Sequence, residues 1–275
     1  MSWAIMPLVN GWREFGEQAA YDCLGQSLPT NLLLVCQGVD DPTRLAVEDF
    51  QRRQPDRVFA WFWDPMMPSL SGVWNRALDA VWAMGDTEAL VVNHDIRIRP
   101  KTFEVLLGVM GHTDALLVSA VGVTAEQYQH DAPIDDRLLT PPGANYVAKP
   151  LAPGGPDFSC FVISQACHQA YRFDEGFIPA FAEDLDLHRR LLLDGKGSQI
   201  FSVNVPYLHY ASQTLKAMTP ERRALVDRQI ESISRAHYAR KWGTGGVNRE
   251  TFIEPFGPEA HDNVTTPELQ AALRD

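Results

Sequence analysis

An acidic cluster near residue 185 is the part of the sequence best suited to proton transfer. Glu183, Asp184 and Asp186 stand close together, and Leu187 and Leu191 follow at helical spacing. This periodicity predicts that the acids open a helix, where the helix dipole favours negative charge. A carboxylate held there could accept a proton from an attacking hydroxyl group. The same acids could serve only to stabilise the helix start, and the pattern leaves both interpretations open.

A second polar group follows an apolar run at 88–92. Asp95 could bind a hard divalent cation through its carboxylate, and Asn93 could contact a ribose hydroxyl. His209, after the run at 199–205, could act as an imidazole ligand to the same cation. The alternatives are that Asn93 and Asp95 cap a turn and that His209 is an ordinary hydrogen-bonded side chain.

Short apolar runs that alternate with helical periods must position these residues. We expect strands at 3–9, 31–36, 58–63, 88–92, 115–121, 158–163 and 199–205, and helices at 12–24, 42–53, 69–84, from Pro100 onward, 182–194 and 219–242. This alternation predicts an α/β fold with a mostly parallel sheet flanked by helices. Ligands of such sheets bind beyond the carboxyl ends of the strands, so Asn10, Gln37, Asp41, Asp64 and Asp95 are candidates.

Composition excludes several classes of protein. The chain has 275 residues, of which 45% are hydrophobic, so extensive disorder is excluded. Its net charge of −11 disfavours binding to duplex nucleic acid. No apolar run approaches the roughly 18 residues of a transmembrane helix, and no signal peptide is recognisable, so we expect a cytoplasmic protein. Without a CxxC pair, the cysteines are expected to be buried thiols.

The segment 124–157 is rich in proline and glycine and is expected to form a long loop, either a lid or a binding loop. A further weak helix is expected after Thr266. No glycine-rich Walker or dinucleotide-binding motif occurs in the chain.

In their order and spacing these motifs resemble the family 2 glycosyltransferases, which have the GT-A fold. The resemblance rests on Pro7-Leu8-Val9-Asn10, the turn at 35–43, Asn75, Val92-Asn93-His94-Asp95, Phe173-Asp174-Glu175-Gly176-Phe177, Glu183-Asp184-Leu185-Asp186-Leu187 with Gly195, and His209. The two acidic motifs at 173–177 and 183–187 are its most specific part. The stretch 238–243 also resembles an ending found in some members.

The resemblance implies an inverting transfer of a sugar from a nucleoside diphosphate sugar, above all a UDP-sugar, to an acceptor hydroxyl. It implies Asp184 as general base, with Glu183 as second choice, and Mn²⁺ or Mg²⁺ bound by Asp95 and His209. The residues it implies for binding the donor are Pro7, Asn10, Gln37, Asp41, Asn75 and Asn93. The GT-A domain would span 1–215, with a donor half at 1–95 and an acceptor half at 96–215, and 216–275 would form a C-terminal helix and tail.

Two departures from the family pattern bear on these expectations. Cys36 stands where an acid usually contacts the nucleobase, and Asn93 replaces the first acid of the metal motif. A nucleotidyltransferase-like enzyme and a non-catalytic nucleotide-sugar-binding module remain alternatives. The acceptor (a glycan, lipid, protein, small molecule or modified nucleic-acid base) and any homo-oligomer are left open. We expect the loop at 124–156 and the helix from Thr219 to shape the acceptor site.

Overall fold

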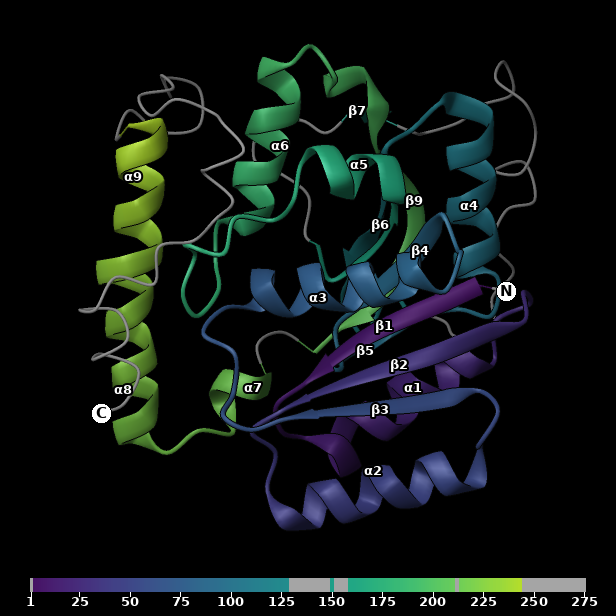
Figure 1. Ribbon diagram of the computed structural model, residues 1–275, viewed down its shortest axis with the longest axis vertical. Coiled ribbons are helices and arrows are strands. Elements are labelled where there is room, and N and C mark those ends of the chain that lie inside the picture. Colours follow the sequence, from purple (N-terminus) through teal and green to yellow (C-terminus); the bar gives the residue numbers. More distant parts are fainter. Residues whose placement is uncertain (1, 129–148, 151–157, 211–212, 244–275) are drawn as a thin grey trace.

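The computed structural model describes residues 2–128, 149–150, 158–210 and 213–243 (Figure 1). Its strands are β1 (Ser2–Leu8), β2 (Thr30–Gln37), β3 (Val58–Trp63), β4 (Glu88–Val92), β5 (Ile96–Arg97), β6 (Leu117–Val123), β7 (Lys149–Pro150), β8 (Cys160–Ser164) and β9 (Ile200–His209). Its α-helices are α1 (Glu17–Leu24), α2 (Asp41–Arg53), α3 (Leu70–Ala83), α4 (Thr102–Thr113), α5 (Gln165–Ala170), α6 (Glu183–Leu193), α7 (Gln213–Lys216), α8 (Pro220–Gln229) and α9 (Ala236–Trp242). Two π-helical turns, at Trp12–Gly16 and Ile230–Arg235, lead into α1 and α9, and a 3₁₀ turn at Gly197–Gln199 leads into β9.

The described strands form one nine-stranded sheet in the order β3-β2-β1-β4-β8-β6-β9-β5, with β7 paired to β9. Strands β3, β2, β1, β4, β6 and β9 run in one direction, and β5, β7 and β8 run in the other. The expected α/β fold with a mostly parallel sheet is therefore confirmed. Its parallel half ends in β3, which has only β2 as a neighbour.

Helices cover both faces of the sheet, because side chains alternate along each buried strand. Ala4 and Met6 belong to a hydrophobic cluster shared with α1, α2 and α4, whereas Trp3 and Ile5 belong to a second cluster shared with α3, α5 and α6. Figure 1 shows α3 across one face and α1 and α2 on the opposite side. These two cores fix the strands whose ends carry the candidate residues.

The seven expected strands and the main expected helices are present, with differences of one to a few residues at their ends. The last strand is longer than expected. It continues through Pro206 to His209, and Pro206 lies where the register between β6 and β9 shifts. An irregular position tolerates a residue without a backbone N–H group. Strands β5 and β7 and helices α5 and α7 were not expected.

Several expectations fall outside the described residues. These are most of the loop at 124–157 and the tail with its helix after Thr266. Within the part that is described, no helix has the length and apolar character needed to cross a membrane.

Candidate functional site

Polar side chains meet where β4 and β9 end. Asn93 Nδ2 donates to Ser159 Oγ at 3.1 Å, and Ser159 Oγ lies 3.5 Å from His209 Nδ1. His209 Nε2 lies 3.5 Å from Asp95 Oδ1. The antiparallel pairing of β5 with β9, which sets Ile96 opposite His209, brings these residues together. Three predicted residues, Asn93, Asp95 and His209, thus form one continuous set of contacts. Ser159, which links them, was not predicted.

The Asp95 carboxylate is held ionised although it is only 4% exposed. Burial raises its pKa, but the His209 imidazole, the nearby His94 and the backbone N–H of Gln213 outweigh that effect and hold the pKa below its ordinary value. His94 is also buried, and burial lowers its pKa, which favours the neutral ring. The site therefore presents a carboxylate at neutral pH.

The short helix α7 lies across the same edge of the sheet. The backbone N–H of Gln213 donates to Asp95 Oδ2 at 3.1 Å. Asn10 Nδ2 donates to the Thr214 carbonyl at 3.4 Å, and Thr214 Oγ1 lies 3.4 Å from His94 Nε2. The helix therefore contacts residues that follow both β1 and β4.

Three predicted donor-binding residues share the carboxyl edge of β1 and β2, since these strands are parallel neighbours. They are Pro7 in β1, Asn10 beyond it, and Gln37 at the end of β2. The Gln37 side chain is buried, and its Oε1 accepts a hydrogen bond from Met67 N at 2.9 Å. Among the described residues, Gln37 Nε2 and Asn10 Oδ1 are buried without a partner. A buried donor and a buried acceptor without partners are costly, which favours a polar ligand at this edge.

Asp41 and Cys36 differ in what they offer that edge. Asp41 is exposed in the first turn of α2, where the neighbouring Asp40 caps the helix by accepting from Thr43 N at 2.9 Å. Burial raises the pKa of Cys36 to about 12, so the thiol stays neutral. The residue that replaces the usual acid therefore carries no charge toward a nucleobase.

Asn75 is buried in α3, and all its hydrogen-bonding capacity is used inside the protein. Its Nδ2 donates to Phe173 O at 2.8 Å and to Glu175 Oε1 at 3.0 Å. Its Oδ1 accepts from Phe173 N at 3.0 Å and contacts His168 Nε2 at 3.1 Å. Trp82 Nε1–H donates to His168 Nδ1, so the neutral ring carries its proton on Nε2 and donates to Asn75. Asn75 thus fastens the segment 173–175 to α3, and this placement speaks against the predicted contact with a donor.

The two candidate bases stand in the first turn of α6. Glu183 is buried, and burial, followed by the charge of Asp184, raises its pKa to about 8. Within the described part of the chain, Glu183 Oε2 has no hydrogen-bond partner. Asp184 is half-buried, and its Oδ1 accepts from Leu185 N at 2.7 Å. At neutral pH Glu183 is largely protonated, so Asp184 is the better candidate for a base.

A buried ion network ties α9 to both acidic motifs. Lys241 is 3% exposed, and its Nζ lies 2.6 Å from Asp174 Oδ2 and 2.8 Å from Asp186 Oδ1. Trp242 Nε1 donates to Asp186 Oδ1 at 2.8 Å, and His237 Nε2 lies 2.9 Å from Asp174 Oδ2. The helix therefore joins the segment 173–177 to the start of α6, next to Asp184. The resemblance at 238–243 was the only sequence signal for this role.

Asp95 and His209 provide a donor set that fits a divalent cation. Two ligands of one such ion with bonds of about 2.1 Å lie roughly 3 Å apart, close to the 3.5 Å between Asp95 Oδ1 and His209 Nε2. In the described ranges, no group of three or more His, Cys, Asp or Glu side chains is placed to hold a metal. A cation bound here would complete its coordination with phosphate oxygens and water, as Mg²⁺ commonly does.

The comparisons with known proteins find similarity at the level of the fold. No family model matches the chain, and no curated protein matches it. TarS of S. aureus in complex with UDP superposes with a TM-score of 0.55 at 12% identity, over 87% of this chain and 74% of that one. The chain has a GT-A-type fold.

Two further structures support the GT-A-type fold. Glucosyl-3-phosphoglycerate synthase from Mycobacterium tuberculosis, in complex with Mn²⁺, UDP and phosphoglyceric acid, gives a TM-score of 0.54 at 14% identity, covering 84% of this chain and 76% of that one. Mannosyltransferase PcManGT from Pyrobaculum calidifontis, in complex with GDP-Man and Mn²⁺, gives a TM-score of 0.55 at 13% identity. The superposition covers 94% of this chain and 66% of that one. At such low identity the likeness extends to the GT-A-type fold, and membership of family 2 stays a prediction.

Proposed function

We propose that this protein is a divalent-metal-dependent glycosyltransferase of family 2 that moves a sugar, with inversion, from a nucleoside diphosphate sugar to an acceptor hydroxyl. The observation that carries the proposal is the pair Asp95 and His209 at the carboxyl edge of the sheet, 3.5 Å apart and linked to Asn93 through Ser159. The GT-A-type fold, shared with proteins whose structures contain UDP or GDP-Man, supports it.

In this proposal the donor half at 1–95 binds the nucleotide and the acceptor half at 96–215 presents the acceptor. The buried polar atoms of Asn10 and Gln37 support a polar ligand at the ends of β1 and β2. With Cys36 neutral, recognition of the base relies on Asp41 or on backbone groups, beside the buried Gln37. A UDP-sugar is the first donor to test.

Asp95 and His209 would hold Mn²⁺ or Mg²⁺. When bound, the cation stabilises the negative charge that develops on the departing diphosphate. Asp184 takes the proton of the acceptor hydroxyl as that oxygen attacks the anomeric carbon from the face opposite the diphosphate. The protonated Glu183 does not compete for this proton at neutral pH, since burial raises its pKa to about 8.

The test uses release of the nucleoside diphosphate from UDP-glucose, UDP-N-acetylglucosamine, UDP-galactose and GDP-mannose in the presence of Mn²⁺. With a donor that the wild type hydrolyses, we expect Asp184→Asn to lower the rate about 10²-fold or more, because it removes the general base. Binding of the nucleotide should stay within a factor of about two of the wild type by calorimetry. The control is Asp56→Asn, which changes an exposed acid between α2 and β3.

Unchanged turnover in Asp184→Asn would remove the assignment of the base. Binding of a nucleotide sugar by the wild type without any turnover would favour the non-catalytic binding module. Consumption of a sugar 1-phosphate together with a nucleoside triphosphate would favour the nucleotidyltransferase-like enzyme.

A further inference from the structure

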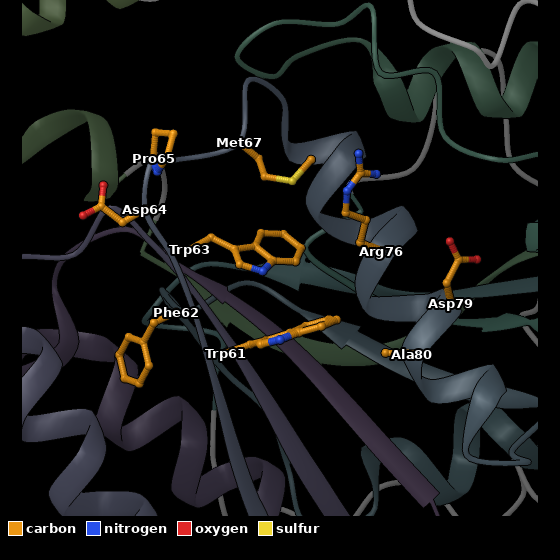
Figure 2. A pocket seen from close by; sticks show the side chains of 9 residues that line it. All are labelled: Trp61, Phe62, Trp63, Asp64, Pro65, Met67, Arg76, Asp79 and Ala80. Atoms are coloured by element: carbon orange, nitrogen blue, oxygen red, sulfur yellow. The ribbon is translucent and has the colours of Figure 1, made fainter.

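A pocket of about 670 Å³ lies between the edge strand β3 and helix α3. Figure 2 shows Trp61 and Trp63 extending from β3 toward α3, which carries Arg76 and Asp79, whereas Phe62 points to the other side of the strand. Met67 closes the end of the pocket nearest the β3–α3 connection. The volume is in the range of pockets that bind small molecules.

In the aromatic wall of this pocket Trp61 is exposed, whereas Trp63 is partly buried and packs against the hydrophobic cluster shared with α3. Trp61 is 38% exposed, and its ring centroid lies 5.1 Å from that of Trp63 with 46° between the planes. The two indoles therefore form an angled surface rather than a flat stack. Leaving a large aromatic side chain in contact with water costs free energy. An exposed aromatic surface of this kind therefore favours a binding site.

The opposite wall is polar and is held in place from outside the pocket. The side chains of Arg76 and Asp79 are 50% and 49% exposed. Arg172 binds Asp79 with two hydrogen bonds of 2.8 and 2.7 Å, and Arg76 Nη1 lies 3.7 Å from Glu175 Oε1. These contacts orient a guanidinium group and a carboxylate, which are a strong donor and a strong acceptor, beside the indoles.

We propose that this pocket binds a neutral pyranose unit of an oligosaccharide, stacked on Trp61 and Trp63 and hydrogen-bonded to Arg76 and Asp79. The C–H face of a pyranose carries a small positive charge that complements the negative face of an indole ring. Its neighbouring hydroxyl groups both donate and accept, and thus match a guanidinium and a carboxylate on one wall.

The local charge favours a neutral sugar over a phosphate or a uronic acid. Arg76 and Arg172 are set against Asp79, Glu175 and Asp64, so the pocket and its supporting pairs have no excess of positive charge. An anion would lose its hydration without gaining an unpaired cation.

The pocket is separate from the residues assigned to transfer. None of Asp95, His209 and Asp184 lines it. It meets the donor side at Gln37, which pairs with Trp63 in the sheet and accepts from the backbone N–H of Met67. The inference goes beyond the proposed transfer, because saccharide binding here needs neither metal nor nucleotide. It gives the protein a means of retaining a glycan near its donor site.

The experiment titrates the metal-free, nucleotide-free protein with cellotetraose, maltotetraose, chitotetraose and mannotetraose. Tryptophan fluorescence and calorimetry report binding. We expect at least one of these neutral saccharides to bind, and Trp61→Ala and Arg76→Ala each to weaken that binding tenfold or more. Arg76 is a half-exposed side chain, so its removal keeps the test independent of any loss of folding in the tryptophan variant.

Phe59→Ala is the matched control. Phe59 lies on the same face of β3 and is 40% exposed, but its ring packs on Trp3 at 5.1 Å and does not line the pocket. It should bind the saccharide as the wild type does. Both tryptophan and control variants should retain the wild-type affinity for UDP with Mn²⁺, which separates this inference from the proposed function.

Three results would overturn the inference. The first is no binding of any of the four saccharides, and the second is an equal loss in Phe59→Ala and Trp61→Ala. The third is a dimer of the wild type that Trp61→Ala dissociates, since the edge strand β3 would then be covered by a second copy of the chain. A lack of glycosyl transfer, by contrast, leaves saccharide binding to be judged by its own titration.

Discussion

Burial gives two adjacent carboxyl groups different chemistry at the start of α6. Glu183 is buried, and its pKa is raised to about 8, while the neighbouring Asp184 is half-buried. The ordinary pKa of a glutamate is about 4.3. Because the pKa of Glu183 in the folded state is higher than its ordinary value, ionisation of this side chain at high pH destabilises the folded state. The resulting loss of stability is absent below the ordinary pKa, grows as pH rises from there to about 8, and is constant above that value.

Glu183→Gln should therefore stabilise the protein at high pH and change little at low pH. At pH 8 we expect a gain on the order of a few kcal/mol in the free energy of unfolding, because glutamine has no proton to lose. At pH 4.5 the two proteins should differ by less than about 1 kcal/mol. Urea denaturation at both pH values measures this. A variant that is less stable than the wild type at pH 8 would contradict the burial of an uncharged Glu183.

At the scale of single residues, the sequence predicted which residues belong to the candidate site better than it predicted their hydrogen-bond partners. Asn93, Asp95 and His209 were predicted from their position after strands, and they do lie together. Asn75 was predicted as a donor contact from a motif, yet it is occupied by Phe173, Glu175 and His168. A motif gives the identity of a side chain, whereas its hydrogen bonds depend on segments about a hundred residues away.

At the scale of elements, α9 was expected as a helix, but its buried ion pairs were not. Its Lys241 forms buried ion pairs with both Asp174 and Asp186, which come from two different segments of the chain, and Asp186 also pairs with Arg190. The hydrogen bond from His237 and the charge of Lys241 outweigh burial and hold the pKa of Asp174 well below its ordinary value. Because that folded value is depressed, this contribution to stability is present above about pH 4 and is lost as pH falls below it.

Lys241→Met should strongly destabilise the protein, because it leaves two buried carboxylates without their shared cation. Removal of one partner from a buried ion pair costs about 3–5 kcal/mol. Arg240→Met, on the same helix but exposed, should cost less than about 1 kcal/mol. Chemical denaturation at pH 7 compares the two variants. Equal stability of both would show that α9 does not anchor the acidic motifs.

Helices and strands were predictable where a short stretch of sequence carries the signal for them. Apolar runs marked β1, β2 and β4, and the helix start at Thr219-Pro220 marked α8, where Thr219 Oγ1 accepts from Arg222 N. The two-residue strand β5 carries no such signal, because it exists only by pairing with β9. The same pairing brings His209 to Asp95, so the most consequential contact of the site depended on an element too short to predict.

At the scale of the whole molecule, the described C-terminal residues touch both parts of the proposed site. Gln213 binds Asp95 at the carboxyl edge, and Lys241 binds Asp186 in α6. Figure 1 shows α8 and α9 as a column alongside the sheet, with α7 at the strand ends. A ligand bound at the carboxyl edge of the sheet should therefore stabilise the folded state of the whole chain. Thermal unfolding should detect this stabilisation.

UDP together with Mn²⁺ should raise the melting temperature of the protein. A ligand at a hundred times its Kd adds about 2.7 kcal/mol to the stability of the folded state. For a chain of 275 residues this corresponds to a shift of roughly 5 °C. Since Asp95 would hold the cation, Asp95→Asn or an excess of EDTA should abolish most of the shift, whereas Asp184→Asn should keep it. A shift by UDP that is equal with Mn²⁺ and with EDTA would separate nucleotide binding from the metal and remove Asp95 and His209 as its ligands.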